Sequence, residues 1–305
     1  MKNRIKTALF LFTFFTGFHA SGQIRPQVRE AELKINGSSM NGFIVSVPYV
    51  KPVEVKKDWI RLIEKGTKSK VELYENSEIL LNGANLKDIS DSSMNIYSKV
   101  VSNDTASFLQ AAFEIKDFGF INSGEYSTEA TLIRTMMFNF ARDEYSDVVE
   151  DELKSEEKTL KDLEKELDKT IQEKDKMEKE IIKYESDIMV TKDKILNLEY
   201  DLKTQQQAIN DQKTTVSKIS KDNKDEKKTQ EEVLKDLEKE KKRIFKDIEN
   251  GQKDIVEYNS KIQENKLDII GNLSDQETLR EKISGQEKIV EQIAAELKTL
   301  KDMQL

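Results

Sequence analysis

The sequence predicts a small α+β head followed by a long all-α coiled coil that folds back as an antiparallel helical hairpin. All three prolines lie within the first 52 residues, and neither glycine nor proline occurs between Gly124 and Gly251. Beyond residue 152, a seven-residue series occupied mainly by apolar side chains runs along the chain, which specifies a left-handed coiled coil. We therefore expect a signal peptide at 1–22, the head at 23–140 and the coiled coil at 141–305.

The N-terminus has the three parts of a secretory signal. Basic side chains at positions 2, 4 and 6 precede an apolar run at 8–18, and small residues follow at 20–22. Cleavage is expected before Gln23. The apolar run is about half of the roughly 20 residues that a spanning helix needs, and no later segment is apolar enough to cross a bilayer. The sequence therefore predicts an exported chain, periplasmic or secreted, with no transmembrane segment after signal removal.

The charge of the chain is acidic. The formal net charge is -8, from 50 basic and 58 acidic residues. Removing 1–22 takes away three basic residues and no acidic one, which moves the net charge to about -11. Because no basic stripe interrupts this acidic character, we expect no nucleic-acid partner.

The residue types also limit the chemistry. The chain has no cysteine, and its single histidine, His19, lies in the expected signal peptide. Zinc sites that need Cys or His, and nucleophiles that need an imidazole or a thiol, are therefore not expected in the mature chain. Carboxylates remain, but none are paired at a spacing that indicates catalysis. We expect no enzymatic activity, no catalytic residue, no cofactor and no metal.

The head is expected to contain two layers. Alternating apolar residues at 31–35 and 43–47 predict two strands joined by a turn at 36–39. A short amphipathic helix opens at Pro52 and ends near Gly66. Further strands are expected at 70–74, 78–81, 94–101 and 107–115, and a final helix from about 127.

The apolar faces of the two helices predict the core of the head. The expected core residues are Trp59, Leu62, Leu132, Met136 and Phe140. A groove lined by Trp59, Tyr49 and Tyr97 is the alternative, but a single tryptophan on an amphipathic helix favours a buried anchor. Nothing in the sequence breaks the last helix after Phe140.

The seven-residue series has a companion series that changes phase. The companion lies three residues later in the first stretch and four residues later in the last third. This pattern fits either a continuous helix with a stutter or two antiparallel arms. The expected core positions are Leu153, Leu160, Leu167, Ile181, Ile188, Ile195, Leu202, Ile209, Leu237, Ile244, Ile248, Ile255, Ile262, Ile269, Leu279, Ile283 and Ile293.

Pairing across the seam favours the hairpin. If the numbers of facing residues sum to 446, Leu202 meets Ile244, Tyr184 meets Ile262, and polar positions also meet polar positions. A shift by one heptad would bury polar groups against apolar ones, at a cost in stability. The expected arms are 141–219 and 226–302, with a polar tip at 220–225.

Two glycine pairs have the spacing of a phosphate loop, Gly37 with Gly42 and Gly119 with Gly124. The lysine that such a loop needs is replaced by Phe43 in the first and by an acidic side chain in the second, so both are interpreted as turns. The long charged helices resemble in composition the stalks of chromosome-maintenance ATPases, but the nucleotide-binding motifs of that family are missing.

These observations predict a structural or interaction protein, a coiled-coil scaffold or spacer of the cell envelope that presents a small globular head. The hairpin also resembles periplasmic holdase chaperones, which are typically basic, and coiled-coil activators of cell-wall hydrolases. Both remain alternatives. The protein partner is not identified by the sequence, and self-association through the coiled coil is a further expectation.

Overall fold

The computed structural model describes residues 25–74, 78–116, 118–220 and 222–305. The expected signal peptide and its cleavage point before Gln23 lie outside this range. The chain divides into two compact units, one comprising the residues up to Glu157 with Ile289–Leu305, the other Lys158–Lys288. The first unit thus extends past the predicted boundary at residue 140. Among the described residues, none of the helices contains an apolar stretch that could span a bilayer.

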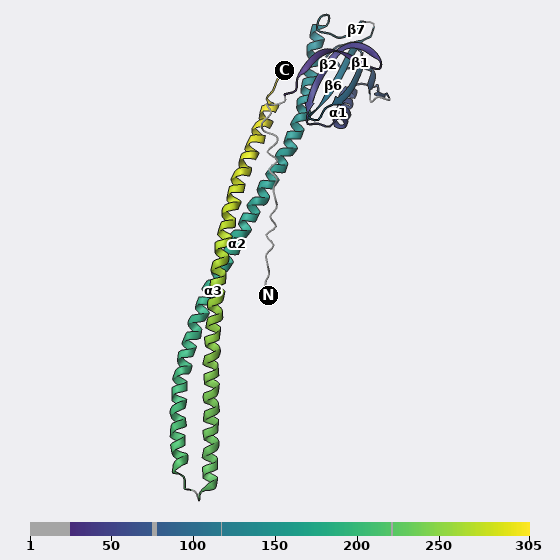
Figure 1. Cartoon of the computed structure of the whole chain (residues 1–305). Coiled ribbons are helices and arrows are strands. Elements are labelled where there is room, and N and C mark those ends of the chain that lie inside the picture. The colour runs from purple at the N-terminus through teal and green to yellow at the C-terminus, as the bar shows by residue number, and fades with distance from the viewer. Residues whose placement is uncertain (1–24, 75–77, 117, 221) are drawn as a thin grey trace. The chain divides into compact units, whose positions relative to one another are not determined.

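The fold class predicted from the sequence is confirmed. An antiparallel sheet forms the head and is followed by two long helices, α2 (Ser127–Lys218) and α3 (Lys224–Lys301), as Figure 1 shows. The break between these helices, after residue 218 and before residue 224, overlaps the predicted polar tip at 220–225.

The sheet has the strand order β1-β2-β6-β5-β4-β3, with β7 paired to β6, and every pairing is antiparallel. The strands are β1 (Val28–Ile35), β2 (Ser38–Pro48), β3 (Glu72–Leu73), β4 (Ile79–Ala84), β5 (Met94–Ser102), β6 (Ala106–Ile115) and β7 (Gly119–Phe120). The structure adds β7 to the predicted strands, because two residues are too few to show alternation. At the β1–β2 turn, Asn36 and Gly37 both have positive φ, 53° and 75°, as a two-residue hairpin turn requires.

Helix α1 (Pro52–Glu64) and the first turns of α2 cover one face of the sheet. Proline at the start of α1 suits a helix N-terminus, and Gly66 beyond its end has a φ of +80°. Trp59 of α1 is fully buried against Phe140 of α2, with ring centroids 5.4 Å apart. The main core of the head therefore lies between the sheet and these two helices.

One predicted core residue is misplaced. Leu132 is 39% exposed, whereas its neighbour Ile133 is fully buried. The buried residues of α2 in this core are Ala130, Ile133, Met137, Phe140 and Ala141. Successive helical residues point about 100° apart, so Leu132 faces away from the sheet.

The second unit is a helical hairpin in which α2 and α3 run antiparallel (Figure 1). Its register differs from the predicted one. Tyr184 stacks on Tyr258, and the Nε2 of Gln212 donates to the Oε1 of Gln230 at 2.8 Å. Residue numbers in both pairs sum to 442 rather than 446, so Tyr184 does not meet Ile262. The predicted register set members of the seven-residue series opposite each other, as Leu202 opposite Ile244. In the structure, a member of the companion series of α2, Tyr184, faces a member of the seven-residue series of α3, Tyr258.

The predicted seam positions of the coiled coil are all buried or half-buried. The most buried of them include Ile209, at 2% exposed, and Ile262, at 5%. Ile195 packs with Ile244 and Ile248 in a separate apolar cluster. Burial of about 1.5–3 kcal/mol per large aliphatic side chain makes this seam the main source of the hairpin's stability.

Candidate functional site

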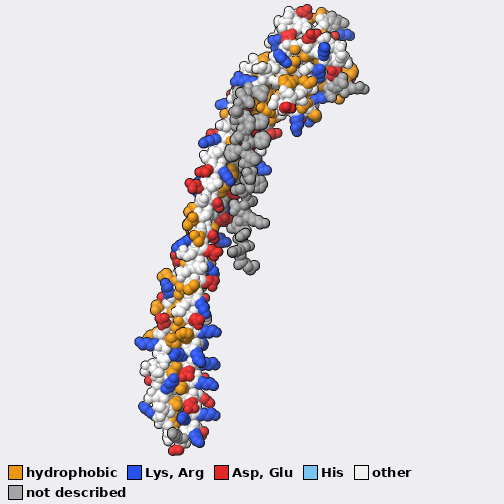
Figure 2. Space-filling view, viewed as in Figure 1, with side chains coloured by type: hydrophobic (Ala, Val, Ile, Leu, Met, Phe, Trp, Pro, Cys, Tyr) orange, Lys and Arg blue, Asp and Glu red, His pale blue; other side chains and the backbone are white. Residues whose placement is uncertain are grey.

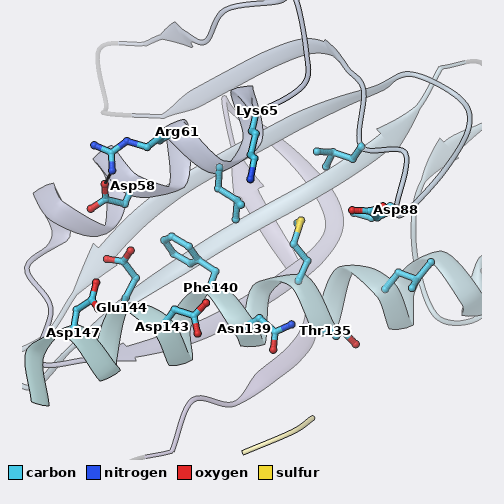
Figure 3. Close-up of a pocket in the computed structure, with 15 residues that line it drawn as sticks. Asp58, Arg61, Lys65, Asp88, Thr135, Asn139, Phe140, Asp143, Glu144 and Asp147 are labelled. Carbon is cyan, nitrogen blue, oxygen red and sulfur yellow. Dashed lines mark ion pairs between the residues drawn. The ribbon is translucent and has the colours of Figure 1, made fainter. Parts of the chain in front are cut away.

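A pocket of about 690 Å³ lies in the first unit, between α1, the connection from β4 to β5, and the start of α2. Its apolar floor includes Leu62, Ile89, Met136 and Phe140. The misplaced Leu132 also lines this pocket, which accounts for its exposure. Figure 3 shows the polar rim, with Lys65 and Asp88 toward one end and acidic side chains toward the other.

The acidic end of the pocket combines side chains from both helices. Glu144 projects from α2 toward α1 (Figure 3), where Asp58 forms an ion pair with Arg61 at 2.8 Å. Burial, together with the neighbouring carboxylates of Asp58 and Asp147, raises the pKa of Glu144 to about 7. Arg61 opposes this shift only weakly. Glu144 is therefore a carboxyl group that changes its charge near neutral pH.

Most of the ionisable side chains that line this pocket are carboxylates. A raised carboxyl pKa is one requirement for a general acid or base, but a nucleophile or an electrophilic partner is also needed. Among the residues described, no group of three or more His, Cys, Asp or Glu could hold a metal ion. The acidic cluster would repel a phosphate or a carboxylate. Its charge suits a basic group better than an acidic one.

The groove considered for Trp59, Tyr49 and Tyr97 does not form. Trp59 is buried, and its Nε1 donates to the Oγ of Ser98 at 3.0 Å. Tyr97 packs on Phe120 beside the smaller apolar cluster of the sheet, which is separate from the cluster that contains Trp59. Tyr49 packs on Tyr145 instead. The three rings therefore belong to three different environments.

The two glycine pairs serve structural roles. Gly37 is in the hairpin turn, and Gly42 lies within β2, where a Cβ atom would approach the carbonyl oxygen of Ala111 to 2.7 Å. Near Gly124, the Oδ1 of Asn122 accepts bonds from the backbone amides of Gly124 and Glu125. The interpretation as turns holds at Gly37 and Gly124, whereas Gly42 lies within β2 and Gly119 within β7.

The end of α3 packs on the start of α2 within the first unit. The hydroxyl of Tyr145 donates to the Oε1 of Glu296 at 2.7 Å, and the Nη1 of Arg142 donates to the carbonyl of Met303 at 3.1 Å. Val149 and Ile293 belong to the apolar cluster beneath these bonds. Burial raises the pKa of Tyr145, and its bond to Glu296 adds to the effect. The C-terminal turns of α3 are thus a part of the folded head unit.

A buried polar ladder crosses the seam of the second unit. The Nδ2 of Asn272 donates to the carbonyl of Thr170 at 2.9 Å, and its Oδ1 accepts from the Nε2 of Gln276 at 2.8 Å. Arg280 donates in turn to the Oε1 of Gln276. Asn272 and Gln276 are only 8% and 2% exposed. Buried polar side chains of this kind set the register of a coiled coil.

The sequence prediction did not single out the pocket or the ladder. The acidic end of the pocket had a signal, since Asp143, Glu144 and Asp147 lie on adjacent turns where α2 still packs on the head. From the sequence, the residues of the ladder are recognisable only as polar residues at seam positions that are otherwise apolar. Its bonds depend on a register that the series alone does not determine.

Comparison with solved structures gives a distant similarity. No family model matches the sequence, and no curated protein matches it. A crystal structure of the Smc head domain with a coiled coil and joint, derived from Pyrococcus yayanosii, is 12% identical to this chain with a TM-score of 0.28. The match covers 90% of this chain and 69% of that one.

Proposed function

We propose that this chain is an exported coiled-coil scaffold or spacer of the cell envelope, without enzymatic activity, which presents its head to a protein partner. The observation that supports the proposal most is the helical hairpin of the second unit. Its seam is closed by apolar side chains and by the Asn272–Gln276 ladder, so the hairpin needs no client or ligand to complete its core.

The head supplies the recognition surface in this proposal. Its pocket has an apolar floor and an acidic end that includes Glu144 and Asp147. An aliphatic side chain next to a lysine or arginine would fit both parts, because the chain's carboxylates would pair with the basic group. A protein partner is therefore favoured over a small anionic ligand.

Export is tested by following the full chain in the cells that make it. We expect an envelope or extracellular fraction whose protein begins at Gln23, detected by mass spectrometry of the intact chain. A matched variant with Leu11→Arg and Phe14→Arg should keep the uncleaved N-terminus in the cytoplasm, because it interrupts the apolar region of the signal. Recovery of the unmodified chain in the cytoplasm, with Met1 or Lys2 at its start, would contradict the export part.

A holdase chaperone is the second candidate, because the arm carries exposed apolar side chains such as Met189 and Val256, 69% and 70% exposed. Exposed apolar surface of this kind can hold unfolded clients. Light scattering of a heat-unfolded enzyme separates the two functions. A scaffold leaves the aggregation rate unchanged at equimolar ratio, whereas suppression of aggregation would support the holdase.

A further inference from the structure

The arm, residues 158–288, exposes apolar side chains along one of its faces. On α2, Ile182, Met189 and Leu196 lie seven residues apart and are 66%, 69% and 62% exposed. The corresponding exposed residues of α3 are Phe245, Val256, Ile270 and Leu273. In Figure 2, apolar side chains are visible along the arm among charged ones. We call these residues of α2 and α3 the apolar stripe.

The stripe lies on a single face because of its position relative to the seam. Each of its residues directly follows a seam position, as Met189 follows Ile188 and Val256 follows Ile255. One step along a helix turns the side chain by about 100°. Since α2 and α3 run in opposite directions across the seam, the same step turns both sets of side chains toward the same side of the hairpin.

The stripe is long enough to be an interface between helices. The register places Leu273 near the level of residue 169 and Phe245 near that of Leu196, so the stripe extends over about 40 Å at 1.5 Å per residue. Single exposed apolar residues are ordinary on a protein surface, but a contiguous patch beyond a few hundred Å² marks an interaction site. The heptad spacing of 182, 189 and 196 is the spacing by which one helix packs on another.

The charges beside the stripe are complementary to a second copy of the same face. A two-fold axis along the arm sets α2 of one copy against α3 of the partner at the same level. Lys192 then lies near the partner's Glu249, and Glu178 near the partner's Lys266. Glu199 likewise lies near the level of the partner's Lys246. All of these side chains are exposed in the single chain, and each pairing joins opposite signs.

Other arrangements lose this complementarity. A two-fold axis across the arm would pair α3 with α3 and set Lys253 near the partner's Lys266, two like charges. In the arrangement along the arm, the favourable charge pairing ends where the stripe ends. Beyond one end of the stripe Lys203 comes near the partner's Lys242, which confines the favourable contact to the stripe itself.

We infer that the apolar stripe is the interface between two copies of this chain, whose arms pack side by side with their tips at the same end as a four-helix bundle. The inference rests on the proposed scaffold function and names its partner as a second copy. Helices in such bundles pack through apolar faces flanked by charges, as both arms would here. The dimer would double the number of heads that one scaffold unit carries.

The test is the oligomeric state of the full chain, measured by analytical ultracentrifugation from about 1 to 100 µM. We expect a mass twice that of one chain, which is 35.3 kDa as encoded. Met189→Glu, in the stripe, should weaken the dimer at least tenfold. Val190→Glu is the matched control, because Val190 is 65% exposed but points about 100° away from the stripe.

A charge exchange tests the orientation. Lys192→Glu and Glu249→Lys should each weaken the homodimer, because each sets like charges against each other in both contacts of the pair. An equimolar mixture of these two variants should restore a dimer, since every contact in the heterodimer then joins opposite charges. Pairing within one chain could not give this restoration.

Helix content from circular dichroism distinguishes a failure of the dimer inference from a failure of the scaffold proposal. A helical chain that stays monomeric up to 100 µM, or equal behaviour of Met189→Glu and Val190→Glu, would overturn the dimer while the scaffold proposal stands. If the wild-type chain dimerises but the mixture of Lys192→Glu and Glu249→Lys does not, the arrangement along the arm is overturned. A wild-type chain with little helix would overturn the scaffold proposal itself.

Discussion

Tyr184 and Tyr258 stack across the seam of the helical hairpin, with ring centroids 5.9 Å apart and ring planes 22° from parallel. The Nζ of Lys261 lies 5.5 Å from the centre of the Tyr184 ring and adds a cation–π contact. This pair fixes which residues of α2 and α3 share a level. The polar ladder from Asn272 and the Gln212–Gln230 bond obey the same register.

Replacing Asn272 by alanine should destabilise the hairpin. The substitution removes the donor to the carbonyl of Thr170 and leaves the buried Nε2 of Gln276 without its acceptor. A cost of about 1–3 kcal/mol in the free energy of unfolding follows for a buried polar group left unpaired. Urea unfolding followed by circular dichroism measures it. Asn259→Ala is the control, because Asn259 is exposed and bonds only to its own helix, and a loss as large there would remove the argument for the ladder.

Gly42→Ala and Gly285→Ala should have opposite effects on stability. A Cβ at Gly42 would lie 2.6 Å from the Cδ1 of Leu33 and 2.7 Å from the backbone oxygen of Ala111, and the sheet cannot move that oxygen cheaply. A cost of about 1–3 kcal/mol is expected. A Cβ at Gly285 meets nothing within 4 Å in the interior of α3, so alanine should stabilise by about 0.5–1 kcal/mol. Thermal or urea unfolding of both variants checks the signs.

Trp59 and Ser98 form a buried bond whose loss should be measurable. Ser98→Ala leaves the indole N–H of Trp59 without an acceptor in the core, which should cost about 1–3 kcal/mol. Because Trp59 is the sole tryptophan, its fluorescence reports on the head alone. Tyr200→Phe, at a position 72% exposed, is the control and should change stability by less than about 0.5 kcal/mol. Equal stability of Ser98→Ala and wild type would contradict the assignment of this bond.

The head should lose stability as the pH rises toward neutral, because of Glu144. Its pKa is about 7 in the folded chain against an ordinary value of 4.5, so the folded state binds more protons than the unfolded state between these values. Stability from this group is therefore fully present below about pH 4.5 and declines through pH 7. Glu144→Gln should flatten that decline and stabilise the chain at pH 8 by about 1–3 kcal/mol.

Tryptophan fluorescence during urea unfolding at pH 5, 6, 7 and 8 measures the effect. Glu166→Gln, at an exposed position in the arm, provides the matched loss of one carboxylate. If wild type and Glu144→Gln show the same slope of stability against pH, Glu144 is not buried beside the carboxylates of Asp58 and Asp147 as described.

Much of the fold was predictable because its signals are local and periodic. The alternation in 43–47, the proline that opens α1 and the seven-residue series each indicate one element without knowledge of the rest. The fold class followed from them. Where one face of a helix must be chosen from two adjacent apolar residues, as with Leu132 and Ile133, the choice depends on how α2 sits on the sheet.

The register of the hairpin was not predictable for a related reason. Two registers that differ by half a heptad both bury the apolar series, since either can place Ile195 among isoleucines of α3. The difference lies in single contacts, the stacking of Tyr184 on Tyr258 and the carbonyl of Thr170 that Asn272 reaches. The acidic end of the pocket likewise needs the closeness of Asp58 to Glu144, which are far apart along the chain.

Disulfide trapping tests the antiparallel hairpin most directly, and the absence of cysteine in the chain makes it simple. Tyr184→Cys with Tyr258→Cys should form an intramolecular bond quickly under mild oxidation at low protein concentration, because these positions share a level. Tyr184→Cys with Ile262→Cys, offset by about one helical turn, should react slowly. Faster disulfide formation by the second pair would contradict the register. Disulfides that form only between chains would contradict the hairpin.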